Sequence, residues 1–478
     1  MRGSHTGKTN TGDIGRRNKG KGQAMMPRIA RGAAVALASV LVLTGCAGGA
    51  TPESGAGGSG GSSDEKLTMW VLGGDTPDAL RDYLKDTFAE KTGATLDIQQ
   101  QDWGDIITKL TTSLPDEKNT PDVTEIGNTQ SPTFTNVGAF LDITDMVEEL
   151  GGDNLLESFV DAGKVEDQNF TLPYYFGSRY MFYRKDIWEA AGVTVPKTLD
   201  EFNTAVATIS EKNPKDIKDF SGFFLGGQDW RDGVSWIFAN GGDIAQLKDG
   251  KWVSTLDSAE SLKGLQQLQD LQRNASNAPN DAKDSNQYIY LNDSDQTVDA
   301  DGNKSGDTSL SAATIMAPGW AHWSIGDLST DDEGKPVRTW NDDVFGTFAL
   351  PGNDGKPAPV FAGGSNIGIS AKTQHPELAK ELMRIIFSDE YQQMLGENGL
   401  GPANEKFASS LGDDQFAQAL IESASNSKLT PAAPGWASVE AANLMEEFFS
   451  KIEAADDLSA LAKEYNGKID ALLNVKAG

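Results

Sequence analysis

The feature that most restricts the fold of this chain is an alternation of strand and helix patterns in its first third. Apolar and β-branched residues form short strand-like runs at 66–72, 94–98 and 122–126. The two intervening stretches, 78–91 and 106–114, place apolar side chains at helical spacing. Consecutive strands that are joined by helices run parallel, so the alternation predicts an α/β chain with a doubly wound sheet.

Polar residues follow two of these strands at the points where the strands end. The first run is followed by Gly73-Gly74-Asp75 and the third by Asn128-Thr129-Gln130. In doubly wound sheets, ligands bind in the crevice beyond the carboxyl ends of the strands. We therefore expect Asp75, Asn128 and Gln130 to form hydrogen bonds with a ligand.

The N-terminal 45 residues have the pattern of a signal peptide. Eight basic residues stand there against one acid, Asp13, and an apolar run from Ala33 to Leu43 follows. That run is too short to span a bilayer and is typical of a signal-peptide core. It ends in Leu43-Thr44-Gly45-Cys46, which matches the bacterial lipobox, in which the cysteine is acylated and becomes the new N-terminus. We expect residues 1–45 to be removed, although a signal peptide followed by a chance cysteine would show the same pattern.

Cys46 is the only cysteine in the sequence. A secreted chain without a possible disulfide pair fits lipid attachment of that cysteine better than redox chemistry. Two features of the leader stay open. Met25 or Met26 could be the true start in place of Met1, and Arg16-Arg17 is only a partial match to a twin-arginine signal, so the export route is undecided.

Residues 46–63 consist largely of Gly, Ser and Ala and predict a flexible tether between the lipid and a folded body. The whole chain has a formal net charge of −29. Because the leader is basic, the body that follows it is more acidic still. Such a surface disfavours nucleic acid and anionic lipid as partners. We therefore expect contact with a membrane only through the lipid.

Four tryptophans lie beside chain breaks, where an indole can face a ligand. Trp320 follows a short apolar strand and the breaker Pro318-Gly319. Trp436 follows a second Pro-Gly pair, and Trp103 and Trp230 adjoin Gly or polar residues. Indole rings pack on the C–H faces of pyranose sugars, and planar amides and carboxylates bind their hydroxyls. The pattern favours a carbohydrate site, with burial of Trp320 as an ordinary core aromatic as the alternative.

The Asp-rich stretch 274–308 invites comparison with a calcium-binding loop. Asp299 and Asp301 have suitable spacing, but Lys304 stands where such loops have a glycine and Leu310 where they have a bidentate Glu. We therefore predict a solvated insertion at this place, with no metal and no other cofactor.

Taken in order, several short motifs resemble a known family. The motifs are the lipobox, the tether, Leu67 to Leu72, Asn128-Thr129-Gln130, Pro173 to Arg179 with Tyr183-Arg184-Lys185-Asp186, Asn240-Gly241-Gly242-Asp243, Ala317-Pro318-Gly319-Trp320, Gly363-Gly364-Ser365-Asn366 and Pro434-Gly435-Trp436. In this order they are similar to the extracellular sugar-binding lipoproteins of ABC importers, the family of maltose-binding protein. The similarity covers nearly all of the chain after the leader, and the stretch 274–308 departs from it.

This resemblance implies a two-lobed fold of the periplasmic-binding-protein type. Each lobe would be a doubly wound sheet flanked by helices, with the chain crossing between the lobes. Lobe one would comprise residues 64–172 and 344–395, and lobe two residues 173–343 and 396–478. The ligand would be held between the lobes and would stabilise a closed form that a membrane permease recognises.

The resemblance also implies site residues. Trp320 matches the family's stacking aromatic at the end of a second-lobe strand, and Trp436 is similar to an aromatic near the start of a late helix. Asn128 to Gln130 match a polar strand end in lobe one. Further residues in matching segments are Arg179, Asp243, Gly364 and Ser365.

We therefore expect a substrate-binding lipoprotein of an ABC transporter rather than an enzyme. It would be a monomer, held by its lipid on the extracellular face of the cell membrane, with an oligosaccharide and the permease subunits as partners. Several aromatics favour a disaccharide or a longer sugar. Residues 173–186 and 317–320 are most similar to those of actinobacterial binders of chitobiose and cello-oligosaccharides.

Two other classes of function remain open. A secreted glycoside hydrolase needs two carboxylates across a cleft, and this acidic chain offers many pairs, but the two histidines after the leader, His322 and His375, form no metal-binding pair. We expect His322 to be an ordinary loop histidine rather than a ligand contact. A binding protein for a peptide or another solute on the same fold is the second alternative.

Overall fold

The computed structural model describes the folded body of the chain. The described residues are 65–283, 287–293, 297–298, 304–305, 310–330, 334, 336–424 and 426–475. By its contacts the chain divides into two units, Met1–Ser59 and Gly60–Gly478, and all the described residues belong to the second. The predicted signal peptide, Cys46 and the tether therefore lie outside the described residues, as do Asp299 and Asp301.

The largest sheet has eight strands, with the order β11-β6-β15-β3-β1-β2 along its main path and with β14 and β16 each paired to β6. Its strands are β1 (Lys66–Leu72), β2 (Thr95–Gln101), β3 (Val123–Gly127), β6 (Thr171–Arg184), β11 (Thr314–Pro318), β14 (Phe345–Phe348), β15 (Ala362–Ile369) and β16 (Gly401–Pro402). β1 pairs in parallel with both β2 and β3. The helices α1 (Asp78–Thr92) and α2 (Ile106–Ser113) connect these three strands, as the strand and helix alternation predicts.

Both faces of β1 are covered. Met69 and Val71 pack in one cluster with Leu80 of α1, whereas Leu72 packs in another with Ile106 of α2. Successive side chains of a strand point to opposite faces, so each helix covers one face of the sheet. This is the arrangement of a doubly wound sheet, and it leaves the carboxyl ends of β1 and β3 to carry polar residues.

β6 carries the sheet from these parallel strands into a second part of the fold. It is one strand of 14 residues, in the region that the sequence predicts to be an extended crossing. Its first half pairs with β15 and β16 and its second half with β11 and β14, all antiparallel. The doubly wound pattern is thus seen for β2-β1-β3. Around the second half of β6 the described pairings differ from that prediction, because β11 and β14 each run back along β6.

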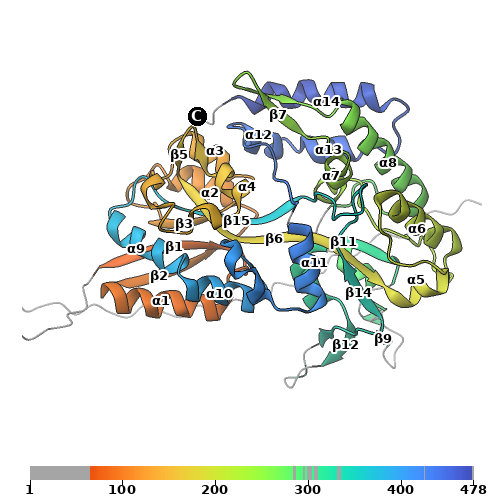
Figure 1. Cartoon of the computed structure of the whole chain (residues 1–478), viewed down its shortest axis with the longest axis horizontal. Coiled ribbons are helices and arrows are strands. Elements are labelled where there is room, and N and C mark those ends of the chain that lie inside the picture. The colour runs from red at the N-terminus through yellow and green to blue at the C-terminus, as the bar shows by residue number, and fades with distance from the viewer. Residues whose placement is uncertain are drawn as a thin grey trace, which may run out of the picture. The chain divides into compact units, whose positions relative to one another are not determined.

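Helices flank both parts of this sheet. They are α3 (Ser131–Asn136), α4 (Glu157–Ala162), α5 (Lys185–Ala191), α6 (Leu199–Lys212), α7 (Trp230–Ala239), α8 (Ala259–Ala275), α9 (Pro376–Ile386), α10 (Asp389–Glu397), α11 (Gln415–Ala424), α12 (Trp436–Ala441), α13 (Leu444–Phe449) and α14 (Leu458–Leu473). Figure 1 shows α1, α9 and α10 around the parallel strands and α5 and α6 near the far end of β6. Within the described part of the chain, no helix is long and apolar enough to cross a membrane.

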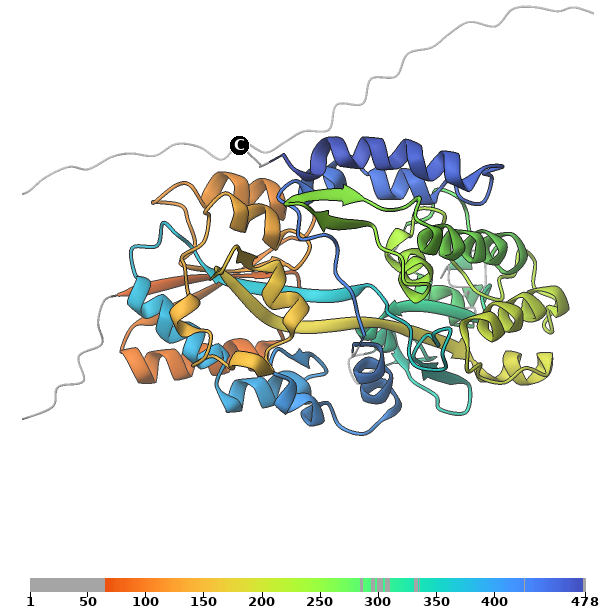
Figure 2. The same cartoon turned by 45° about the horizontal axis from the view of Figure 1, so that its top comes forward.

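Short elements complete the fold. The two-stranded sheets are β4 (Lys164–Val165) with β5 (Gln168–Asn169), β7 (Ala245–Lys248) with β8 (Lys251–Ser254), β9 (Thr297–Val298) with β10 (Lys304–Ser305), and β12 (Asp327–Thr330) with β13 (Pro336–Thr339). The 3-10 helices are η1 (Thr144–Met146), η2 (Gly152–Asn154), η3 (Gln287–Leu291), η4 (Gly319–Ser324) and η5 (Glu405–Leu411). The β7–β8 hairpin lies along α14 (Figure 2), where the N–H of Ser254 donates to Asp470 at 2.6 Å.

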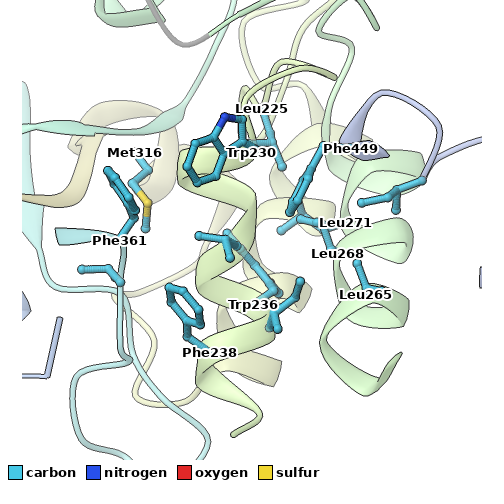
Figure 3. Close-up of a cluster of buried hydrophobic side chains, with 14 of the residues drawn as sticks. Leu225, Trp230, Trp236, Phe238, Leu265, Leu268, Leu271, Met316, Phe361 and Phe449 are labelled. Atoms are coloured by element: carbon cyan, nitrogen blue, oxygen red, sulfur yellow. The ribbon is translucent and has the colours of Figure 1, made fainter. Parts of the chain in front are cut away.

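Two large hydrophobic clusters form most of the core. One surrounds α7, where Trp230 and Trp236 pack among side chains from α8, β11 and α13 (Figure 3). The other lies between the parallel strands, α1 and α9. In the segment 344–395, which the sequence analysis assigns to lobe one, Val360 packs in the first cluster and Ile367 in the second. The predicted lobe boundaries stay a prediction.

β15 is irregular where it passes from β6 to β3. Its register against β6 shifts between Ser365 and Asn366, and Gly364, just before the shift, has a φ of +122°. A Cβ atom on Gly364 would lie 2.4 Å from the carbonyl oxygen of Tyr175 on β6. Glycine is therefore required here, and the close approach fixes β15 against β6 at the level of Tyr175.

Replacing this glycine tests the close approach. Gly364→Ala is expected to lower the free energy of unfolding by about 2–4 kcal/mol, because the added methyl group meets backbone at a positive φ. Gly467→Ala is the matched control, since a Cβ on Gly467 of α14 has nothing within 4 Å. It should be neutral or more stable by up to about 1 kcal/mol. Urea denaturation followed by circular dichroism measures both, and equal stability of Gly364→Ala and wild type would contradict the close approach.

Candidate ligand-binding site

Trp103 lies across the carboxyl ends of β1 and β3. A Cβ on Gly73 would lie 2.8 Å from Trp103 Cδ1, and a Cβ on Gly127 would lie 3.2 Å from Trp103 Cζ3. Glycine at both strand ends thus leaves the space that the indole fills. Trp103 Nε1 donates to Asp75 Oδ2 at 2.9 Å, and 38% of Trp103 is exposed. The structure therefore brings together two residues that the sequence analysis selects, Asp75 and Trp103, and part of the indole stays accessible.

A buried hydrogen-bond network lies beside Asp75. Tyr175 Oη lies 3.1 Å from Asp75 Oδ2 and 3.0 Å from Glu125 Oε1. Ser365 Oγ lies 3.3 Å from Tyr175 Oη, and the N–H of Leu72 donates to Glu125 Oε2 at 2.7 Å. Asp75 and Ser365 are candidates from the sequence, whereas Glu125 and Tyr175 are not. An acid in the middle of a strand with two covered faces is nevertheless a signal for a buried carboxyl group.

Burial keeps the proton of this network on Glu125. Burial and the neighbouring Asp75 carboxylate raise the pKa of Glu125 to about 8. Burial also raises the pKa of Asp75, while the hydrogen bonds from Trp103 and Tyr175 lower it. A protonated Glu125 donates to Tyr175 Oη, which in turn donates to Asp75. Each hydrogen bond then has one donor, and the negative charge lies on Asp75, at the end of β1.

A second set of contacts joins the residues after β3 to α12. Thr129 Oγ1 and Gln130 Nε2 donate to Glu440 Oε2 at 3.4 Å and 3.3 Å, and the N–H of Ala437 donates to Thr133 Oγ1 at 3.3 Å. Burial raises the pKa of Glu440, and the nearby Arg231 guanidinium opposes that rise. We call this contact between residues 129–133 and residues 436–446 the seam.

Four buried polar atoms along the seam have no hydrogen-bond partner among the residues that the structure describes. They are Gln130 Oε1, Trp436 Nε1, Glu440 Oε1 and Glu446 Oε2, and of these the Trp436 side chain lies close enough to Glu440 to lower the pKa of that carboxyl group. Arg231 Nη2 approaches Glu440 Oε1 only to 3.8 Å. Leaving a buried polar group unpaired costs about 1–3 kcal/mol, so such groups are rare in folded proteins. Their concentration here marks a place where the polar groups of a ligand would be stabilising.

Two buried indoles pack beside these unpaired atoms. The ring centroids of Trp230 and Trp436 are 6.2 Å apart at 69°, and Trp230 Nε1 donates to Glu446 Oε1 at 3.1 Å. Their exposed fractions are 1% for Trp230 and 0% for Trp436. Phe361, seen beside Trp230 in Figure 3, has its ring centroid 5.4 Å from that of Trp230. The Arg179 guanidinium lies 5.9 Å from the same Phe361 ring, so Arg179 belongs to this group.

The two parts of the site meet at Gly127. A Cβ on Gly127 would lie 2.0 Å from Gln130 Oε1 and 3.2 Å from the Trp103 ring. The side chains of Gln130 and Trp103 therefore share the space above the end of β3. Asn128 directly follows Gly127, and its side chain points into the protein, where its Nδ2 donates to the Ala362 carbonyl at 3.2 Å.

The remaining sequence candidates make other contacts. Trp320 is 53% exposed, and its ring centroid is 5.8 Å from that of Tyr288. Asp243 Oδ2 lies 3.4 Å from Lys428 Nζ. Gly364 contributes backbone only, and its carbonyl accepts from the N–H of Asn128 at 3.4 Å. None of the contacts described for these three residues reaches the seam.

Two hollows in the described surface lie away from the seam. One of about 480 Å³ is lined by Tyr180, Trp323 and Phe416, among others. It lies on the opposite face of β6, because Tyr180 directly follows Arg179 and neighbouring side chains of a strand point apart. Another, of about 440 Å³, lies between the end of α13 and the start of α14. No sequence candidate lines either hollow, and no group of His, Cys, Asp or Glu among the described residues could hold a metal ion.

Comparison with known proteins identifies the family and the fold of this chain. Residues 84–421 match the model of the bacterial extracellular solute-binding protein family. The diacetylchitobiose binding protein DasA of Streptomyces coelicolor is 30% identical over 451 residues, which are 92% of this chain and 98% of that protein. The sugar-binding protein MalE of Xanthomonas citri has a TM-score of 0.68 at 18% identity, with 85% of this chain and 97% of that chain covered. The GacH receptor of Streptomyces glaucescens has a TM-score of 0.66 at 16% identity, with 87% and 100% covered.

An α/β fold that matches these structures is of the periplasmic-binding-protein type. The chain belongs to the bacterial extracellular solute-binding protein family. This confirms the family resemblance that its motifs carry. Members of this family bind solutes, so the chain is a binding component and not an enzyme.

Replacing Glu125 by Gln is expected to remove a pH dependence of stability. The pKa of Glu125 is about 8 in the folded chain, against 4.5 for an ordinary Glu, so the unfolded chain loses this proton first as the pH rises. The free energy of unfolding of the wild type should fall relative to Glu125→Gln by up to about 1.4 kcal/mol per pH unit between these two values, and the difference should level off above pH 8. Urea denaturation of both proteins across that range measures the difference. A difference that did not change with pH would contradict a protonated Glu125.

Proposed function

We propose that this chain is the substrate-binding lipoprotein of an ABC transporter, which holds a di- or oligosaccharide between two lobes and delivers it to a membrane permease. The observation that carries the proposal is the set of unpaired polar atoms in the seam, beside Trp230 and Trp436 and next to Trp103. Amides, carboxylates and indole N–H groups bind sugar hydroxyls, and indole faces pack on the C–H faces of sugar rings. Family membership supports the solute-binding role.

Relatives with named ligands support a carbohydrate. The Streptomyces coelicolor relative is named as a diacetylchitobiose binding protein. Structures of the same fold include one bound to maltose and one in complex with acarbose, but at these identities they support the fold alone. The resemblance of residues 173–186 and 317–320 to chitobiose and cello-oligosaccharide binders agrees with the first relative. Diacetylchitobiose is therefore the first sugar to test.

The proposal requires the seam to open. Trp436 is fully buried, and Gln130 contacts Glu440 directly, so a sugar can enter only when α3 and α12 move apart, and the two helices then close on it again. Lobe one comprises residues 64–172 and 344–395, lobe two residues 173–343 and 396–478, each built on a sheet flanked by helices. β6 and β15 cross between the lobes and act as the hinge, and the bound sugar stabilises the closed form.

The cellular location follows from the leader sequence. Cys46 carries the lipid, residues 46–63 form the tether, and the folded body stands as a monomer on the extracellular face of the cell membrane. The body needs no cofactor. Trp320 is half-exposed, and the family resemblance, rather than a contact with the seam, supports it as a further stacking surface for the sugar.

Isothermal titration calorimetry tests the proposal with a panel of diacetylchitobiose, cellobiose, maltose and a dipeptide. We expect one of the sugars to bind and to be recovered intact, and the dipeptide to give no heat. Recovery of the sugar in cleaved form would indicate a hydrolase. Binding of the dipeptide without any sugar would leave the fold unchanged and contradict the carbohydrate proposal.

Trp103→Ala should weaken sugar binding about tenfold or more, because it removes the accessible stacking surface at the end of β1. Trp323→Ala is the matched control, since Trp323 is 70% exposed and lines the hollow on the other face of β6. It should leave the dissociation constant unchanged. The same calorimetric titration measures both variants. Loss of binding in Trp323→Ala but not in Trp103→Ala would move the ligand to that hollow.

A further inference from the structure

The unpaired atoms of the seam differ in kind. Gln130 Oε1, Glu440 Oε1 and Glu446 Oε2 are acceptors, whereas Trp436 Nε1 is a donor. The Glu440 side chain is only 10% exposed and Trp436 is 0% exposed, so bulk solvent does not pair with them. A ligand that satisfies this set must offer more hydrogen-bond donors than acceptors.

Hydrogen bonds fix the roles of the three acceptors. Gln130 Nε2 donates to Glu440 Oε2 at 3.3 Å, which orients the amide so that its oxygen is the unpaired atom. Trp230 Nε1 donates to Glu446 Oε1 at 3.1 Å, which leaves Oε2 of that carboxylate unpaired. The partners of Glu440, two donors and a guanidinium, are those of an ionised carboxylate. An ionised carboxylate only accepts hydrogen bonds.

Negative charge also exceeds positive charge at the site. Arg231 lies 3.8 Å from Glu440, and Arg179 forms an ion pair with Asp232 at 2.9 Å. Neither Asp75 nor Glu446 has an ion-pair partner in the described part of the chain, although the Arg81 guanidinium is near enough to lower the pKa of Asp75. A carboxylate on the ligand would therefore meet like charge in a buried, low-dielectric place.

We propose that the seam selects neutral, donor-rich oligosaccharides and rejects acidic ones, with Glu440 as the specificity-determining residue. This inference rests on the proposed function, because it names the class of sugar that the same site takes. Hydroxyl and acetamido N–H groups donate to the three acceptors, and a hydroxyl oxygen or an acetamido carbonyl accepts from Trp436. A uronate in the same position offers acceptors only and repels Glu440.

Two sugars that differ by one carboxylate test this specificity. The pair is diacetylchitobiose and its derivative in which one C6 hydroxymethyl group is oxidised to a carboxylate, or the same pair made from cellobiose if the panel selects that sugar. We expect the wild type to bind the neutral sugar at least about 100-fold more tightly. Glu440→Gln should weaken binding of the neutral sugar about tenfold, and it should reduce the ratio between the dissociation constants of the acidic and the neutral sugar to less than about tenfold.

Control variants separate specificity from folding. Glu464→Gln changes an exposed carboxylate that pairs with Lys468 at 2.9 Å, and it should change neither affinity. If Glu440→Gln lowers the melting temperature strongly, Glu446→Gln is measured in its place. It should also reduce the ratio between the dissociation constants of the acidic and the neutral sugar. Equal binding of both sugars by the wild type, or a ratio unchanged in the variants, would overturn the inference while the proposed function stands. A wild type that binds no sugar at all would overturn the proposed function itself.

Discussion

The alternation of side chains along β6 is the constraint on which the arrangement of this site depends. One strand of 14 residues pairs with β15 and β16 along its first half and with β11 and β14 along its second. Its neighbouring side chains point to opposite faces. Tyr175 therefore faces Asp75, and Arg179 faces the Phe361 ring. Phe176 and Tyr180 point the other way and pack in a hydrophobic cluster on the opposite face of the sheet. A single strand thus aligns both halves of the site and separates it from the hollow behind it.

Buried polar groups give the site its chemical character. At the end of β1, the network of Asp75, Tyr175 and Glu125 is complete when Glu125 keeps its proton, so it holds Trp103 in place. At the seam, the groups around Glu440 have more acceptors than the described residues can satisfy. The first arrangement is rigid because each donor has an acceptor. The second is incomplete, and an incomplete buried network is stabilised by a ligand that completes it.

Much of the fold and part of the candidate site could be predicted from the sequence. The order β2-β1-β3 follows from local periodicity, and Asp75 and Gln130 follow from the rule that ligands bind at the carboxyl ends of parallel strands. Glu440 could not be found this way, because it meets Gln130 only through packing of segments 310 positions apart. Trp436 illustrates the same limit. A Pro-Gly break before a tryptophan indicates a helix start, but only the tertiary packing of α12 shows that the indole is buried.

Locking the seam tests most directly the claim that the ligand binds there. Thr133 and Ala437 are neighbours across the seam, with 3.3 Å between Thr133 Oγ1 and the nitrogen of Ala437. Cys46 is the only native cysteine, so Thr133→Cys and Ala437→Cys in a Cys46→Ser protein introduce the only thiols. Sugar affinity is then measured by calorimetry with the pair oxidised and reduced. Binding is expected to be lost when α3 and α12 are joined by the disulfide and to return on reduction. Equal affinity in the two states would show that the sugar binds elsewhere.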